Sequence, residues 1–362
     1  MRKILFKTNY IFSLVVVALF YSGSLKAKDK KVSKDIKVEI KEYINHHLKD
    51  SYDFSLFSYT NNSGEHVYIG IPLPVIIWDN GIKIFSSSRL KHGEAVAKVG
   101  SDYYKLEHGK IYKTDSEGTI TYNKENHITN DAPFDFSVTK GVVSMLLISF
   151  LMFYIFKNLA ESYRKTGGLP SGIGRFFEPI IIYLRDDIAK PNIGEKKHAS
   201  YMSFLLTVFF FIWFLNMLGL TPLGVNVTGN IAVTFSLALL TFLLTNLTAN
   251  KNYWGHIFWM PGVPIPLKII LAPIEFLGLF IKPFSLLIRL YANIQAGHIV
   301  LYSLIGLMFV FQNLIGSSLS FVLAFFISII EILVALLQAY IFTMLSALYF
   351  GFAVEEHGET EH

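Results

Sequence analysis

A small group of ionisable side chains lies inside segments that are otherwise apolar for long distances. Arg289 sits deep in such a stretch, and Glu275, His298 and Glu331 occur in the same two C-terminal segments. Burying a charge in a bilayer costs at least about 2.5 to 3.5 kcal/mol. Residues that carry this cost are functional by default, because they usually mark ion or proton pathways. These four side chains are therefore our candidates for proton transfer.

The spacing of these residues places them on shared helix faces. Glu275 lies fourteen residues before Arg289, about 21 Å along a helix axis and within about 40° of the same face. Asn293 lies one turn beyond Arg289. In the next segment Glu331 and Gln338 are seven residues apart, which again puts them on one face.

An antiparallel hairpin of these two segments would bring the two sets together. Glu331 would then face the neighbourhood of His298. Gln338 would approach the level of Arg289 and Asn293. The result is an acid and a base near one membrane face, a lone acid near the other, and a fixed positive charge between them. Such an arrangement predicts a proton path with a barrier in its middle.

Some of the polar residues in the span also have a structural interpretation. Asparagine and glutamine in a helix bundle often only form interhelical hydrogen bonds, and Lys282 beside Pro283 fits snorkelling or a kink. Ser285 and Gln295 fit a channel lining and a structural role equally well.

The composition identifies an integral membrane protein. The chain has 362 residues, 52% of them hydrophobic and 16% charged, with a mean hydropathy of +0.44. The formal charge is +5, but the basic residues form no stripe, so we expect no nucleic-acid partner. There is no cysteine, which excludes disulfides and thiolate metal sites. We expect no metal and no cofactor.

The N-terminal third reads as an exported region. Residues 1–27 have the basic start, apolar core and small residues of a cleavable signal peptide. Residues 28–133 predict a small α+β extracytoplasmic domain, with an amphipathic helix over 36–48 followed by short strands separated by turn sequences such as DNG and HG. His46 and His47 are adjacent and point in different directions, so we expect a surface position and not a metal site.

The remainder, 134–362, predicts an all-α polytopic membrane domain with five membrane-embedded helices. We expect spans over 138–160, 201–220, 231–249, 267–311 and 317–352, and an amphipathic surface helix over 175–190. The last two exceed the bilayer thickness and should be strongly tilted or broken. Basic residues after the first span mark a cytoplasmic loop.

Three motifs together resemble subunit a of F-type ATP synthases, the proton-channel stator subunit of the membrane sector. They are KPFSLLIRLYANIQAGH at 282–298, LLQAYIFTMLSALYF at 336–350 and FLNMLGLTPLG at 214–224, followed by the acidic EEH near the end. The resemblance covers 134–357. The exported domain lies outside it, and its role is open between a stator contact, an assembly aid and a cap over the channel mouth.

The resemblance implies a role for each polar residue. Arg289 would be the stator arginine, with Asn293 and Gln338 as its companions. Glu275 would line the inner half-channel. His298 and Glu331 would be the outer pair, with acid and base exchanged relative to the common bacterial pattern.

The resemblance also implies partners and a location. These are a ring of c subunits, b-type peripheral-stalk subunits and the rest of the synthase, in a bacterial inner membrane with the C-terminus cytoplasmic. The chain would not itself be an enzyme, since it contains no G-x-x-x-x-G-K-[ST] motif. A secondary transporter would predict internal repeats, which are not seen. An exported sensor on a passive anchor would leave the spans free of paired charges. The choice between H⁺ and Na⁺ would lie with the ring.

Overall fold

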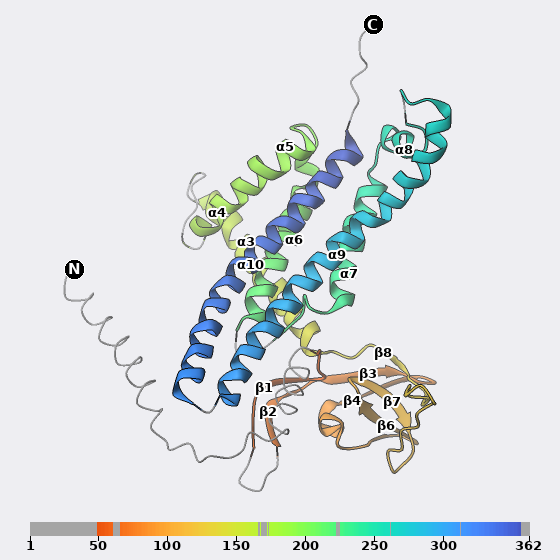
Figure 1. Ribbon diagram of the computed structural model, residues 1–362, viewed down its shortest axis with the longest axis vertical. Helices are drawn as coiled ribbons and strands as arrows, with labels where there is room; N and C mark the ends of the chain where they lie inside the picture. The colour runs from red at the N-terminus through yellow and green to blue at the C-terminus, as the bar shows by residue number, and fades with distance from the viewer. Residues whose placement is uncertain are drawn as a thin grey trace, which may run out of the picture.

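The computed structural model describes residues 49–60, 66–165, 167, 172, 174–221, 225–260, 262–311 and 313–355. A strand-rich domain lies at one end of a long helical bundle, and the C-terminal end of the last helix lies at the other (Figure 1). The expected signal peptide, the amphipathic helix over 36–48 and the histidine pair lie outside the described residues.

The N-terminal domain consists of three small antiparallel sheets. Strands β1 and β2 pair, β3 pairs with both β4 and β8, and β6 pairs with both β5 and β7. Two short 3₁₀ turns, η2 and η3, follow β4. The bounds are β1 Asp53–Thr60, β2 His66–Pro72, β3 Pro74–Trp78, β4 Ile82–Ser86, η2 Ser87–Arg89, η3 Lys91–Gly93, β5 Ala97–Val99, β6 Asp102–Glu107, β7 Lys110–Thr114 and β8 Phe134–Asp135.

The turn and strand patterns of the sequence account for the hairpin of β6 and β7 and for the buried residues of β3. His108 and Gly109, between β6 and β7, both have positive φ, as a two-residue hairpin turn requires. Alternate residues of β3, Val75 and Ile77, are fully buried and pack with Tyr104 in a core of their own. The expected small strand-rich domain is therefore confirmed.

A cluster of charged side chains joins two of the sheets. The Tyr104 hydroxyl donates to Asp79 (2.6 Å), and the Lys113 ammonium contacts both Asp79 (2.9 Å) and Asp102 (3.1 Å). Lys83 donates to Tyr104 (2.7 Å) and to Asp102. The hydrogen bonds from Tyr104 and Lys113 lower the pKa of Asp79, and those from Lys83 and Lys113 lower the pKa of Asp102.

Acid should loosen this domain through the same cluster. Because the pKa of Asp79 and of Asp102 is lower in the folded domain than in the unfolded chain, their contribution is present above the ordinary aspartate pKa, about 3.9, and is lost as the pH falls below it. Hydrogen-exchange protection of β6 and β7 in the intact protein should fall between about pH 6 and about pH 3. Asp102→Asn should weaken this pH dependence, and equal protection at both pH values would contradict the assignment.

The domain is fastened to the first membrane helix at its base. The Asp50 carboxylate accepts the backbone N–H of Gly141 (2.9 Å) and the Thr139 hydroxyl (2.7 Å), so it caps the start of α3. The Lys140 N–H donates to the Ser51 carbonyl (2.8 Å). The two ends of the described part of the domain therefore meet at the start of α3.

Helices make up the rest of the described chain. Their bounds are α3 Lys140–Lys165, α4 Gly174–Tyr183, the π-helical turn η4 Leu184–Ala189, α5 Lys190–Ile193, α6 His198–Gly219, α7 Ile231–Leu247, α8 Lys251–Phe258, α9 Ile265–Val310 and α10 Leu314–Val354. The segment α4, η4 and α5 corresponds to the predicted surface helix.

Four of the described helices, α3, α6, α9 and α10, are long and apolar enough to cross a membrane. The expected span over 231–249 is instead a 17-residue helix, α7, about 25 Å long, followed by α8 at a bend of 102°. The pair makes a fifth candidate span. The polytopic helical fold is thus confirmed, with four or five spans.

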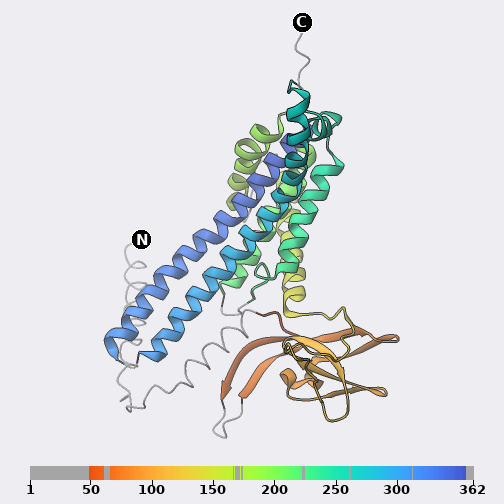
Figure 2. The same ribbon diagram turned by 45° about the vertical axis from the view of Figure 1, so that its right-hand side comes forward.

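The last two helices form the predicted long hairpin. With 46 residues α9 is about 69 Å long and continues through Pro273 and Pro283 without a break. The helix is therefore not broken, and its strong tilt in the membrane stays a prediction. Figure 2 shows α9 and α10 running obliquely to α7.

Candidate functional site

The α9–α10 hairpin brings the predicted polar residues into register. Asn293 Nδ2 on α9 donates a hydrogen bond to Gln338 Oε1 on α10 (2.7 Å). One turn further along α9, Gly297 lies directly against the Glu331 carboxylate. Gln338 and Glu331 of α10 therefore contact two successive levels of α9, Gln338 at Asn293 and Glu331 at Gly297.

His298 and Glu331 line one cavity between the two helices, with a volume of about 360 Å³. Both side chains are buried, His298 to 5% and Glu331 to 8% exposure. Glu331 Oε2 is buried and makes no hydrogen bond with any described residue. A buried carboxyl oxygen needs a partner, and the cavity, which is lined mainly by apolar side chains with a few polar ones such as His298 and Asn216, is large enough to hold water for it.

A second cavity continues from this one toward the hairpin turn. It measures about 580 Å³ and is lined by Tyr302, Met308, Phe321 and Ser328 among others. His298 and Leu220 line both cavities. His298 also stacks on Tyr302, with ring centroids 6.0 Å apart. The histidine therefore lies where the route from the hairpin turn meets the chamber that holds Glu331.

Glycine is required beside the carboxylate, which leads to a test. A Cβ at position 297 would lie 2.6 Å from Glu331 Oε1, so Gly297→Ala must displace that carboxylate. A misplacement of this size should lower ATP-driven proton pumping by about tenfold or more. Gly278→Ala on the same helix is the matched control, because a Cβ there meets nothing within 4 Å. Equal pumping by the two variants would show that Glu331 need not hold its position.

Residues of α6 and of the loop after it link to α9 and α10 by hydrogen bonds near the chamber. Asn216 accepts the Thr228 hydroxyl (2.7 Å) and donates to the Ala335 carbonyl (3.4 Å), linking α6 to α10. Asn226 Nδ2 donates to Gln295 Oε1 (3.0 Å). Gln295 therefore has a visible structural contact, whereas Ser285 lines neither of the two cavities.

Arg289 and Glu275 lie apart from these cavities. Arg289 is half-buried and makes no ion pair or hydrogen bond with any described residue, although it is within electrostatic range of Tyr349. Glu275, also half-buried, has the same relation to Tyr253 on α8. The structure therefore unites His298 with Glu331 and Asn293 with Gln338, but not Glu275 with Arg289.

Lys282 contacts aromatic rings of α10. Its ammonium lies over the rings of Tyr349 (5.9 Å to the centroid) and Phe352 (5.6 Å), and α9 remains helical through Pro283. Cation–π contact with two rings accounts for its place between α9 and α10.

Several residues of the site were not predicted from the sequence. Asn216 is a polar residue within an apolar span, which was a usable signal. Gly219 and Gly297 show their importance only in space: a Cβ at Gly219 would lie 3.4 Å from His298 Nε2. Thr228 and Asn226 lie in a loop whose path no local pattern predicts.

The fold and the site define a multi-pass helical membrane protein with titratable side chains in a chamber between its last two helices. Residues 142–351 match the family model described as ATP synthase A chain, and residues 43–136 match a domain of unknown function. The chain is 44% identical over 236 residues to ATP synthase subunit a of Chloroherpeton thalassium, covering 63% of this chain and 71% of the relative. Subunit a of Pelodictyon phaeoclathratiforme is 42% identical over 237 residues (64% and 69%), and that of Anaeromyxobacter sp. 38% over 264 residues (70% and 62%).

This chain belongs to the ATP synthase subunit a family. It is accordingly a membrane subunit of the F-type ATP synthase complex and not an enzyme by itself.

Proposed function

We propose that the chain conducts protons through two offset half-channels and so couples transmembrane proton flow to rotation and ATP synthesis. The observation that carries the proposal is the pair of cavities that meet at His298, with the unpartnered carboxyl oxygen of Glu331 beyond the junction. A proton entering from the hairpin-turn side can exchange with the imidazole and then with the carboxylate. Both groups can hold a proton and release it.

Two features support an exit on the other side of a barrier. Arg289 lies beyond the Asn293–Gln338 hydrogen bond, on the side away from the chamber. Its guanidinium attracts an ionised carboxylate but cannot pass on a proton, since it stays charged in proteins. Glu275 lies about 21 Å further along α9 and serves as the inner acid.

The proposed partners follow from this division of labour. The carboxylate that Arg289 attracts belongs to a ring of c subunits, which rotates between the two half-channels. Peripheral-stalk subunits of b type and the rest of the synthase hold the chain in place. The direct leak between the two sides is blocked by the fixed charge of Arg289, so protons must travel with the ring.

The proposal includes an orientation in a bacterial inner membrane. Residues 1–27 act as a signal peptide, 28–133 form an extracytoplasmic domain and 134–362 form the membrane domain, with the C-terminus in the cytoplasm. Basic residues Arg164 and Lys165 in the last turn of α3 support a cytoplasmic position for that end. The strand-rich domain, at the opposite end of α3, is then outside (Figure 1).

ATP-driven acidification of inverted vesicles tests the proposal. Vesicles that contain the complete synthase should acidify on addition of ATP, and vesicles from cells lacking this chain should not. Collapse of the signal by a protonophore identifies H⁺ as the ion. ATP-driven uptake of Na⁺ into the vesicles that persists in the presence of the protonophore would assign Na⁺ instead and overturn the proton assignment.

A further inference from the structure

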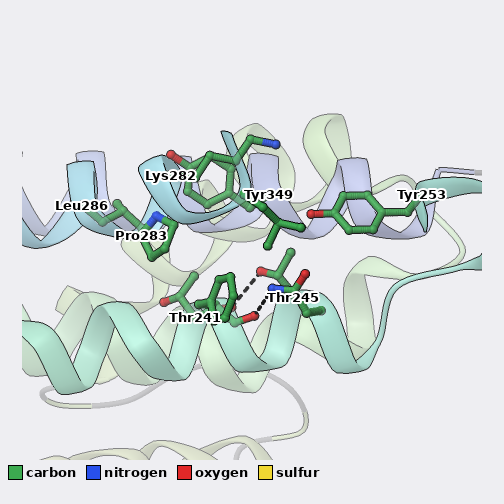
Figure 3. A pocket seen from close by; sticks show the side chains of 10 residues that line it. Thr241, Thr245, Tyr253, Lys282, Pro283, Leu286 and Tyr349 are labelled. Atoms are coloured by element: carbon green, nitrogen blue, oxygen red, sulfur yellow. Dashed lines mark hydrogen bonds between the residues drawn. The ribbon is translucent and has the colours of Figure 1, made fainter. Parts of the chain in front are cut away.

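A third cavity lies between α7, α8, α9 and α10, on the side of Arg289 away from His298. It has room for about one water molecule, about 10 Å³, and is enclosed by polar and apolar side chains from all four helices. In Figure 3, Tyr253 extends its hydroxyl toward the cavity from α8, and Thr241 and Thr245 line it from α7. Lys282 and Tyr349 line it from α9 and α10.

One wall of this cavity carries an unsatisfied acceptor. Asn246 Nδ2 donates to the Phe242 carbonyl (2.7 Å), but Asn246 Oδ1 is buried and accepts no hydrogen bond from any described residue. Leaving a buried amide oxygen unpaired lowers stability. Beside it, the Thr245 hydroxyl already donates to Thr241 (2.7 Å) and retains lone pairs that can accept. The wall is therefore built to bind a donor such as water.

Each of the two tyrosines that line this cavity is also within electrostatic range of one charged group. Tyr253 is within electrostatic range of Glu275, and Tyr349 is within electrostatic range of Arg289. A phenol can accept one hydrogen bond and donate another, so it can relay a proton without becoming ionised. The Lys282 ammonium has only donors and can orient water in the cavity, but it cannot accept a proton while charged.

We propose that Asn246, Tyr253 and Tyr349 form the inner proton path, through a water molecule that Asn246 Oδ1 binds. The path joins the neighbourhood of Arg289 to Glu275 and the inner surface. Helices α7 and α8 thereby take part in proton release, and the bend between them places Tyr253 beside α9. This inference rests on the proposed function, since it supplies the inner half-channel with its residues.

Single cysteines test access to the cavity, because the chain has none of its own. In inverted vesicles the inner face is outside, so Ag⁺ added to the medium should reach Thr241→Cys, which lines the cavity without belonging to the proposed path, and lower ATP-driven pumping by about tenfold. The control is Leu243→Cys, two residues later on α7 and 43% exposed on its surface, which should pump as wild type does with and without Ag⁺. The Ag⁺-treated wild-type complex reports on cysteines of other subunits. A Thr241→Cys complex that pumps and is insensitive to Ag⁺ would overturn the proposal.

A hydroxyl deletion provides a second, milder test. Tyr253→Phe removes one relay atom and should lower pumping by about tenfold in complexes that assemble to wild-type amounts. Tyr154→Phe on α3, where the side chain is 61% exposed, is the matched control and should have no effect. If the wild type pumps and Arg289→Ala does not, yet Tyr253→Phe pumps normally, the inner path is wrong while the proposed function stands. If the wild type itself does not pump, the proposed function fails.

Discussion

Replacement of Arg289 by alanine should stop ATP-driven proton pumping while the complex still assembles. The side chain is half-buried and has no ion pair or hydrogen bond with the described residues, so its removal leaves no charge unpartnered within the chain. What is lost is the fixed positive charge that we place between the two proposed half-channels. We expect the pumping rate to fall below about one hundredth of the wild-type value, a difference of about 2.7 kcal/mol in the barrier. Acidification of inverted vesicles measures the pumping rate, and immunoblots of the purified complexes show that they have assembled.

A lysine at the same position tests whether a positive charge is enough or whether the charge must be permanent. Lysine carries the same charge but can lose its proton when buried, whereas arginine cannot. Arg289→Lys should therefore also fail to pump, or leak protons when ATP is absent. Normal pumping by Arg289→Ala in an assembled complex would make Arg289 structural and remove the basis for two separate half-channels.

Substitution of Glu331 by glutamine should have the next largest effect. Glutamine keeps the size of the side chain but cannot take up and release a proton in the chamber. Positioned proton-transfer groups contribute about 10² to 10⁴ in rate. Pumping by Glu331→Gln should accordingly fall by about a hundredfold, both in ATP-driven acidification and in ATP synthesis driven by an imposed proton gradient.

The same substitution outside the chamber provides the control. Glu355 follows the last residue of α10 and is exposed, so Glu355→Gln should pump as the wild type does. Exchange of the pair, His298→Glu combined with Glu331→His, should restore more activity than either single variant, since one acid and one base would again share the chamber. A Glu331→Gln complex with unchanged pumping would place the outer route elsewhere.

The membrane part could be predicted largely from length and spacing. The seven-residue interval between Glu331 and Gln338 and the hairpin hypothesis were enough to expect the Asn293–Gln338 level, where the structure has a hydrogen bond. Helix periodicity carries such information because every turn advances by a constant rise. The length of α7 was harder to predict. An apolar run does not show that the helix ends at Leu247 or that the next helix, α8, follows at a sharp angle.

The cavities and the hydrogen bonds around them could not be predicted from the sequence. The acceptor on Asn216 meets Thr228 only because the loop after α6 folds back, and loop paths depend on tertiary contacts and not on local pattern. The same limit applies to the N-terminal domain. The turn at His108 and Gly109 has a sequence signature, but the two-residue strand β8, which joins the sheet beside Trp78, has none.

The described strands begin and end beside the start of α3, and this has a consequence for how such a chain can change. Ser51 and Lys140 are hydrogen-bonded neighbours (2.8 Å), so the residues between them form an excursion of the chain that leaves and returns at the same place. An inserted domain whose two ends lie side by side can be shortened, lengthened or exchanged without a shift of the helix that follows it. We therefore expect the sequence of this domain to be able to change independently of the sequence of the membrane helices.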